Sequence, residues 1–418
     1  MLIKFSIQNF GSIKDKQTLS FEADESSHLE NYYVIETNGL RLLKLGLIYG
    51  ANASGKTTIL KALQFFIDIV LKPCERKNQS LDFEPFLFDT DTPKQNTVLE
   101  VEFLQNDVHY SYEVEFCKNA IVGEVLFAKE TAGKNRNKSK VFERTTDTEK
   151  QLANIVFGSR IRINQTLRET LIANTLWNNT VLGGFLKTNM ELKELTDVTN
   201  WFKNYLNPVI YTKTELVGII TRLMDNCSID KKTVLNILGK ADFNLSDISI
   251  NSTMRELKEK GKRTVASVEF EHSVGENSYY LPLEEESQGT QRYFSFAGLL
   301  CLLISHSTLF SVDELESSLH PDLFRHFLLS FPVNSRRSQL LATTHNREIL
   351  SDKDIFRNDA IWIADKNNAD CATELYSLAD FDASVIRNTS NIYNAYRVGK
   401  LGGVPNLGSY YINRESGL

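Results

Sequence analysis

The sequence predicts an α/β protein in which a core of buried strands is accompanied by an antiparallel β lobe and an inserted α-helical lobe. A continuous apolar run at 45–49, typical of a strand buried on both faces, precedes a glycine-containing turn and a helical pattern over 57–70. Alternating runs predict an antiparallel meander at 97–104, 108–116 and 121–129. Short buried-strand candidates return near the C-terminus at 309–312, 340–343 and 361–364.

The remaining elements are weaker. Alternation predicts a strand at 3–7 that pairs with a second one at 16–23. From about 149 to 238 the pattern is helical and polar, without the sustained heptads of a long coiled coil. A helix at 289–305 is apolar on nearly all sides and therefore buried. Two strand-like runs precede it, at 264–271 and 279–283.

The chain has no internal repeat and no Pro- or Ser-rich linker, so we expect its lobes to be discontinuous in sequence. We divide it into two parts of one core, 1–72 and 263–418, separated by an antiparallel β lobe at 73–148 and a mainly helical insertion at 149–262.

Composition excludes several classes of protein. Among the 418 residues, hydrophobic types make up 42% and charged types 24%, values typical of a globular chain and not of a disordered or collagen-like one. The net charge of −6 provides no global basic field for nucleic acid, which leaves only a local basic groove open. The longest strongly apolar run, 296–304, is about half of the ~20 residues that a membrane span needs, so no membrane partner is expected.

The cysteines and the N-terminal residues indicate the cytoplasm. The five cysteines are scattered and form no C-x-x-C pair, which argues against a disulfide framework or a zinc site and fits a reducing compartment. Residues 1–12 alternate polar and apolar side chains and have no apolar h-region, unlike a signal peptide.

The strongest functional signal is the segment Gly50-Ala51-Asn52-Ala53-Ser54-Gly55-Lys56-Thr57, followed by Thr58, which matches G-x-x-x-x-G-K-[ST]. In this pattern successive backbone N–H groups and a helix N-terminus face phosphate groups. Lys56 would reach the β- and γ-phosphates of ATP, and the Thr57 hydroxyl would ligate Mg²⁺. The alternative is a glycine-rich turn with an unrelated lysine. The predicted strand before the segment and the helix after it favour a P-loop.

Two adjacent carboxylates end the predicted strand at 309–312. Asp313 at the strand tip would hold the Mg²⁺ shell, and Glu314 would orient or deprotonate the attacking water. The alternative is a strand followed by an acidic turn, which the P-loop upstream disfavours.

Two further segments indicate the class of ATPase. In chain order, Glu286–Gln291, Asp313–Glu314 and Thr343–Asn346 resemble the signature motif, the Walker B motif and the switch histidine of the ABC-type ATPases, including the SMC and RecF branch. His345 matches the switch histidine, which in that family contacts the γ-phosphate. The resemblance assigns Walker A to the first part of the core and the other three motifs to the second part.

The match to the signature motif is partial. Ser287 and Gly289 match the serine and the second glycine of the family's LSGGQ, whereas Gln288 and Thr290 replace its first glycine and its glutamine. These replacements bear on the rate of hydrolysis. In the family this motif caps the γ-phosphate bound to the partner's P-loop, so the resemblance implies that Ser287 and Gly289 act in trans. It also implies a head-to-tail homodimer, or a larger assembly of dimers, closed over two ATP molecules.

The sequence around the motifs resembles that of a narrower branch, the OLD-like and abortive-infection (Rlo-type) ATPases of bacterial anti-phage defence. The matching segments are IQNFGS at 7–12, NASGK at 52–56, SQGTQ at 287–291, DELESSLHP at 313–321, THN at 344–346 and GKLGGVP at 399–405. Members of this branch work beside a separately encoded effector, often a nuclease or toxin. The chain after His345 shows no Glu followed by an Asp-x-Asp cluster, so we do not expect it to be the nuclease itself.

Three functions stay open from the sequence. The first is an ATP-hydrolysing sensor or scaffold that controls an effector. The second is a RecF/SMC-like DNA-repair ATPase on duplex DNA, which the low pI and the missing coiled coil disfavour. The third is an ATP-binding module with little turnover that stores a toxin, which Glu314 disfavours. The Q-loop glutamine is unassigned between Gln79 and Gln95, and the basic loop 131–140 is either solvated or contacts phosphates of nucleic acid.

Overall fold

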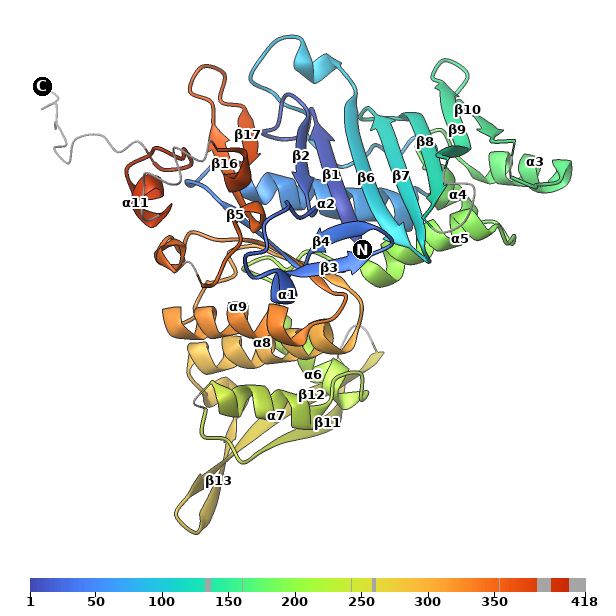
Figure 1. Ribbon diagram of the computed structural model, residues 1–418. Coiled ribbons are helices and arrows are strands. Elements are labelled where there is room, and N and C mark those ends of the chain that lie inside the picture. Colours follow the sequence, from blue (N-terminus) through green and yellow to red (C-terminus); the bar gives the residue numbers. More distant parts are fainter. Residues whose placement is uncertain are drawn as a thin grey trace, which may run out of the picture.

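The computed structural model describes residues 1–131, 137–159, 161–241, 243–257, 261–352, 354–381 and 392–405. Within these ranges the chain forms a mixed α/β structure with a five-stranded core sheet and a seven-stranded antiparallel sheet (Figure 1). Helix α2 (Lys56–Leu71) joins them, because it follows the central core strand and packs Phe66 against Phe5 and Tyr112 of the second sheet.

The core sheet has the strand order β14-β15-β5-β16-β17. Its strands are β5 (Leu45–Tyr49), β14 (Leu309–Val312), β15 (Gln339–Thr343), β16 (Ile361–Lys366) and β17 (Thr373–Ser377). The first four in this order along the sheet run parallel, and β17 is antiparallel to β16. Every residue of β5, β14 and β15 is buried, which explains their continuous apolar runs and confirms the strands expected there.

The second sheet has the order β10-β9-β8-β7-β6-β1-β2. Its strands are β1 (Leu2–Gln8), β2 (Gln17–Ser20), β6 (Thr97–Gln105), β7 (Val108–Phe116), β8 (Ile121–Glu130), β9 (Ser139–Asp147) and β10 (Leu152–Phe157). The predicted meander and the pairing of the N-terminal strand with its neighbour are confirmed.

The expected start of the helical pattern at about 149 was wrong. Strand β10 continues the sheet there, and the first helix after it, α3 (Gln165–Asn174), begins later. Ile155 is the one buried residue of β10, because this edge strand exposes most of its side chains. A strand with one buried position carries almost no hydrophobic alternation, so periodicity could not reveal it.

The helices of the middle of the chain pack on two different bodies. They are α4 (Val181–Leu186), α5 (Lys193–Asn200), α6 (Leu216–Asp225) and α7 (Lys231–Lys240). Helix α4 packs against α2, whereas α6 and α7 pack against the buried helix α8 (Gln288–Ser305), which in turn packs on α9 (Pro321–Asn334). The domain boundaries at 72, 148 and 262 stay a prediction.

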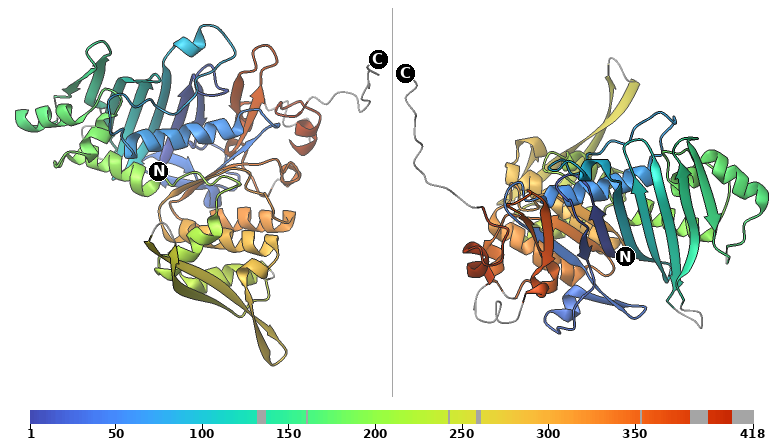
Figure 2. Two further views of the ribbon diagram at one scale, coloured as in Figure 1. Left: turned by 180° about the vertical axis from the view of Figure 1, so that it is seen from behind. Right: turned by 90° about the horizontal axis from the view of Figure 1, so that it is seen from above.

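A short helix, a hairpin and a three-stranded sheet lie outside the two large sheets. A hairpin is formed by β3 (Val34–Thr37) and β4 (Leu40–Leu43) after the short helix α1 (Glu30–Tyr33). A three-stranded sheet, β11 (Asp247–Leu257), β12 (Gly261–Val274) and β13 (Asn277–Pro282), points away from the two large sheets (Figure 2). In the described part of the chain no helix has the length and apolar character to cross a membrane.

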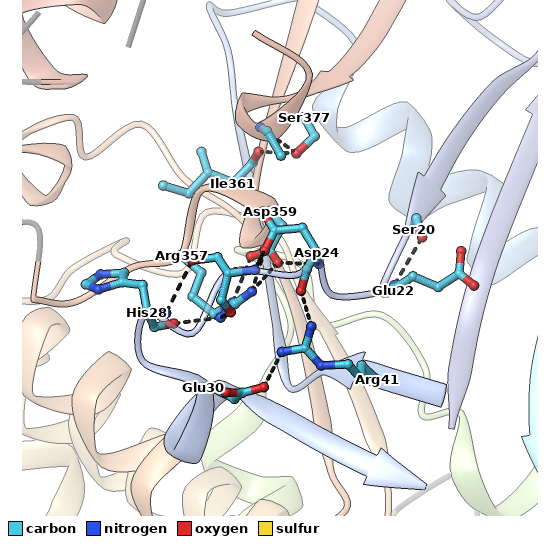
Figure 3. Close-up of polar contacts among 12 residues, drawn as sticks. Ser20, Glu22, Asp24, His28, Glu30, Arg41, Arg357, Asp359, Ile361 and Ser377 are labelled. Carbon is cyan, nitrogen blue, oxygen red and sulfur yellow. Dashed lines mark hydrogen bonds and ion pairs between the residues drawn. The ribbon is translucent and has the colours of Figure 1, made fainter. Parts of the chain in front are cut away.

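A buried arginine fastens the segment after β2 to the loop before β16 (Figure 3). Arg357, 1% exposed, donates to Asp359 at 2.7 and 3.0 Å and to Asp24 at 2.7 Å. It also donates to the carbonyls of Ser26 and His28 at 2.7 and 2.6 Å. A guanidinium is suited to this position because its five N–H groups can satisfy several acceptors at once.

A second buried pair lies in the antiparallel sheet. Glu124 and Arg144 are both 0% exposed by side chain, and Arg144 Nη1 lies 3.7 Å from Glu124 Oε2. Glu124 also accepts from the Tyr112 hydroxyl at 2.6 Å and from the Val181 N–H, the first of α4, at 2.8 Å. Burial raises the pKa of Glu124 to about 6, although the charge of Arg144 opposes this shift. The pair therefore connects α4 to the sheet, although it places two charged side chains in the interior.

We predict that Arg144→Met lowers the free energy of unfolding by about 3 kcal/mol at pH 8, because it leaves the Glu124 carboxylate buried without its cation. The loss should shrink at pH 5, since loss of Arg144 raises the pKa of Glu124 further and the carboxyl group is then protonated and neutral. Urea unfolding at the two pH values measures both. The double variant Arg144→Met/Glu124→Gln is the control, and an equal loss at both pH values in the single variant would contradict the prediction.

Candidate active site

The P-loop lies at the carboxyl end of the central core strand. β5 ends at Tyr49, residues 50–55 form the turn, and α2 begins at Lys56. Gly55 precedes the helix in the left-handed region (φ 99°), where a side chain would be strained. The strand–turn–helix expected from the sequence is therefore present, with the helix N-terminus facing the turn.

The Lys56 ammonium is folded onto the loop. It donates to the carbonyls of Gly50 and Ala51 at 2.9 and 2.8 Å. Burial lowers the pKa of Lys56 to about 8, while the negative charges of Asp313 and Glu314 oppose the shift. A phosphate group would give this ammonium an anionic partner, and the backbone N–H groups of the loop could donate to the same phosphate.

Thr57 and Asp313 meet although they are far apart in sequence. The Thr57 hydroxyl lies 3.1 Å from both oxygens of the Asp313 carboxylate, which ends β14 and is 7% exposed. A hydroxyl, a carboxylate and phosphate oxygens form the oxygen-rich donor set that Mg²⁺ takes in nucleotide sites. These residues therefore fit the metal expected from the sequence.

A threonine orders the two carboxylates. The buried Thr343 at the end of β15 donates its hydroxyl to Asp313 at 2.7 Å and accepts from the Glu314 N–H at 2.8 Å. Glu314 itself adopts a left-handed backbone (φ 49°), which is uncommon for a residue with a side chain and occurs most often where structure enforces it. Thr343 thereby links the two strands at the site.

His345 lies beside Glu314. Its Nε2 is 3.9 Å from Glu314 Oε1, and its backbone N–H donates to Glu316. Burial lowers the pKa of His345 most, and the charge of Lys56 lowers it further, whereas the nearby carboxylates raise it. The imidazole is therefore neutral at pH 7 and can donate a hydrogen bond to an anionic group.

The signature residues are not part of this cluster. Ser287 caps the N-terminus of α8, where its Oγ accepts from the Thr290 N–H at 3.1 Å. Gly289 is the second residue of the helix. Within the described residues no hydrogen bond or ion pair joins Ser287 or Gly289 to the P-loop. Ser287 is exposed, as a residue that contacts a second copy of the chain must be before assembly.

Several residues around the P-loop had no motif to reveal them. Thr373 of β17 donates to the Ser54 carbonyl at 3.0 Å and contacts the Ser12 hydroxyl at 2.8 Å. Tyr211 follows a short segment that runs parallel to β14, in which the Ile210 carbonyl accepts from the Asp313 N–H. Burial and the charge of Asp313 raise the pKa of Tyr211. The two apolar residues before Tyr211, Val209 and Ile210, were the one feature of the sequence that could have indicated a buried segment there.

Two questions left open by the sequence concern the Q-loop glutamine and the basic loop 131–140. Gln79 and Gln95, weighed as the Q-loop residue, make no hydrogen bond to Thr57 or Asp313 in the part of the chain that the structure describes. Residues 132–136 of the basic loop lie outside the described residues.

A cavity of about 740 Å³ opens beside the P-loop. It is lined by Gly50, Asn52, Ser54, His345, Arg347 and Tyr396, among others. The Ser54 hydroxyl is buried and has no hydrogen-bond partner within the described residues. The site thus has polar groups and room between the P-loop and the histidine.

A P-loop follows the central strand β5 of a parallel sheet, a histidine follows the neighbouring strand β15, and two carboxylates follow β14 on the far side of β15. This arrangement defines the ABC-type class of P-loop ATPase. The chain matches the model of the family described as "AAA domain, putative AbiEii toxin, Type IV TA system" over residues 47–351, which is more than two thirds of its length. It belongs to this family. No curated protein matches the sequence.

Several SMC head structures are among the solved structures that are similar to the chain. The SMC head domain from Thermotoga maritima is 13% identical with a TM-score of 0.39, and the match covers 90% of this chain and 98% of that one. An SMC head bound to the C-winged helix domain of ScpA is 14% identical with a TM-score of 0.44, and the match covers 93% of this chain and 99% of that one. A Pyrococcus furiosus SMC head with an extended coiled coil, bound to the C-terminal domain of ScpA, is 12% identical with a TM-score of 0.41, and the match covers 96% of this chain and 98% of that one.

We predict that Thr343→Val leaves ATP binding intact and lowers ATP turnover by roughly 10- to 100-fold, because the hydroxyl that orients Asp313 and Glu314 is lost. Phosphate release measures turnover, and a fluorescent ATP analogue measures binding. Thr221→Val is the matched control, since Thr221 is also buried but donates to a helix carbonyl of α6. Turnover within twofold of the wild type would contradict a positioning role for Thr343.

Proposed function

We propose that the protein binds and hydrolyses ATP with Mg²⁺, and that it serves as the sensor or scaffold subunit of an OLD-like anti-phage, abortive-infection system that controls a separately encoded nuclease or toxin. The observation that carries the ATPase activity is the convergence of Lys56, Thr57, Asp313, Glu314 and His345 at one edge of the core sheet. The family description, which names a toxin and a toxin–antitoxin system, supports the link to defence.

In this proposal each side chain has a defined task. Lys56 leaves the loop carbonyls and pairs with the β- and γ-phosphates, which P-loop residues 50–58 cradle through their backbone N–H groups. Thr57 and Asp313 hold the metal, which when bound neutralises charge on the phosphates. These residues make the γ-phosphorus accessible to attack without a covalent enzyme intermediate.

Glu314 and His345 act on the other side of the γ-phosphate. The 3.9 Å between them leaves room for both to contact one water or one phosphate oxygen. Glu314 orients the water and accepts its proton as the bond from the water oxygen to the γ-phosphorus forms and the bond from that phosphorus to the bridging oxygen breaks, so that ADP leaves with this oxygen. His345 donates a hydrogen bond to the γ-phosphate oxygens. The neutral imidazole adds no second cation that would hold the released phosphate.

Ser287 and Gly289 act across a head-to-tail homodimer. The exposed N-terminus of α8 offers the Ser287 hydroxyl and the helix dipole to the γ-phosphate held by the other copy. ATP therefore favours closure, and hydrolysis removes the group that both copies bind. Opening and closing would transmit the nucleotide state to the effector.

We predict that Glu314→Gln keeps ATP affinity, loses at least ~100-fold in turnover and forms an ATP-dependent dimer, because the water loses its proton acceptor while the phosphate contacts remain. Lys56→Ala should bind no ATP. Sedimentation with and without ATP reports the dimer. Ser287→Arg in the Glu314→Gln background is the control for the interface, and it should bind ATP as a monomer. A dimer that forms equally well with Ser287→Arg would rule out the trans arrangement.

For the role in defence, we expect cells that carry this reading frame with its neighbours to lower the plating efficiency of a sensitive phage, and Lys56→Ala to abolish the protection. Omission of the neighbouring effector frame should have the same effect as Lys56→Ala. Protection by the chain alone would argue against a separate effector. Turnover that duplex DNA stimulates strongly, with no protection, would support the DNA-repair alternative.

A further inference from the structure

The GKLGGVP motif at 399–405 has no task in the reaction proposed above. It follows helix α11 (Ile392–Arg397), which lies beside the β16–β17 edge of the core sheet (Figure 1). Leu401, in the middle of the motif, is 1% exposed, so the segment is packed into the molecule and is not a free tail at this point. We refer to residues 398–405 as the C-terminal glycine loop.

Two tyrosines fasten this loop to the core. The Tyr376 hydroxyl of β17 donates to the Leu401 carbonyl at 3.0 Å, and the Tyr396 hydroxyl donates to the Gly403 carbonyl at 2.8 Å. The Tyr396 ring packs edge-on against Tyr49, the last residue before the P-loop, with centroids 5.9 Å apart. Tyr396 therefore connects the Gly403 carbonyl to the strand end that leads into the P-loop.

Glycine is required where the loop meets the P-loop. Gly403 has a left-handed backbone (φ +65°), and a Cβ there would lie 2.7 Å from Ile363 Cγ2 and 3.4 Å from the Gly50 Cα. Gly402 is also left-handed (φ +67°), and a Cβ there would lie 2.5 Å from Asp365 Oδ2. The absence of side chains thus lets one backbone approach the other.

The same loop forms one wall of the cavity beside the P-loop. Tyr396, Gly402 and Gly403 line it together with Asn52, Ser54 and His345. A loop whose backbone N–H groups bind phosphate must hold its conformation before the ligand arrives, because ordering it on binding would reduce affinity.

We propose that the C-terminal glycine loop is part of the nucleotide site, with Tyr396 and Gly403 as positioning residues that hold Gly50 in its phosphate-binding conformation. The inference rests on the proposed ATPase function. It assigns affinity for ATP, and not the chemical step, to a segment about 350 residues away from the P-loop in sequence.

The test is the split between KM for ATP and kcat in Tyr396→Phe. One neutral hydrogen bond corresponds to roughly a two- to tenfold change in affinity, so we expect KM to rise about fivefold while kcat stays within twofold. Tyr205→Phe is the matched control. The Tyr205 hydroxyl is also buried and donates to Gln339 at 2.9 Å, at the other end of the core strands, so its loss should lower Tm similarly and leave KM unchanged.

Gly403→Ala is the second variant, with Gly39→Ala as its control. Gly39 has a similar backbone (φ +77°), but a Cβ there would meet nothing within 4 Å, so it reports the backbone strain alone. We expect KM to rise at least tenfold in Gly403→Ala and to stay at the wild-type value in Gly39→Ala. If Gly403→Ala does not fold, Tyr396→Phe alone decides.

A wild-type KM in Tyr396→Phe, with a Tm loss equal to that of Tyr205→Phe, would overturn the inference and leave the loop as packing. This outcome differs from a failure of the proposed function, in which the wild type binds no ATP or Lys56→Ala binds it as well as the wild type does. In that case both proposals fall together.

Discussion

The parallel alignment of three strands is the constraint on which the site depends. β5, β15 and β14 run in the same direction and are hydrogen-bonded in register, so the residues that follow them meet at one edge of the sheet. Gly50, Asp313 and His345 come from segments that are separated by up to about 300 residues. The Thr343 hydroxyl then ties two of these strand ends together through Asp313 and the Glu314 N–H. A shift of β14 or β15 by one residue would turn the side chains of that strand to the opposite face of the sheet.

Burial of charge at that edge prepares it for an anionic ligand. Lys56 is 6% exposed and Asp313 is 7% exposed, so each loses much of its hydration. The lysine responds with a pKa lowered to about 8 and with hydrogen bonds to the loop's own carbonyls. Such an arrangement is less favourable than a pair of opposite charges, and a phosphate with its metal supplies the missing charge. Burial of these charges therefore lowers the free energy of unfolding of the protein alone, and binding of a nucleotide would offset that loss.

Support for the P-loop comes from both ends of the chain. Thr373 donates to the Ser54 carbonyl and contacts the Ser12 hydroxyl, and the Tyr396 ring packs against Tyr49. The Arg357 cluster fastens the segment that follows β2 to the loop that leads into β16, the strand next to β5 (Figure 3). The P-loop is therefore supported by residues outside the range 47–351 that the family model matches.

The sequence by itself determined the local units. The phosphate loop, the carboxylate pair and the histidine are short motifs, and the strands that lead to them are apolar on both faces, so composition and period were sufficient to place them. Periodicity was insufficient for β10, where one buried residue leaves no pattern, and no motif marked Tyr211, Thr373 or Tyr396. Their positions depend on partners at least 90 residues distant, such as Asp313, Ser54 and Tyr49. Only the tertiary structure decided these contacts, because a side chain far away in sequence becomes a neighbour only after the sheet has paired and the core has packed.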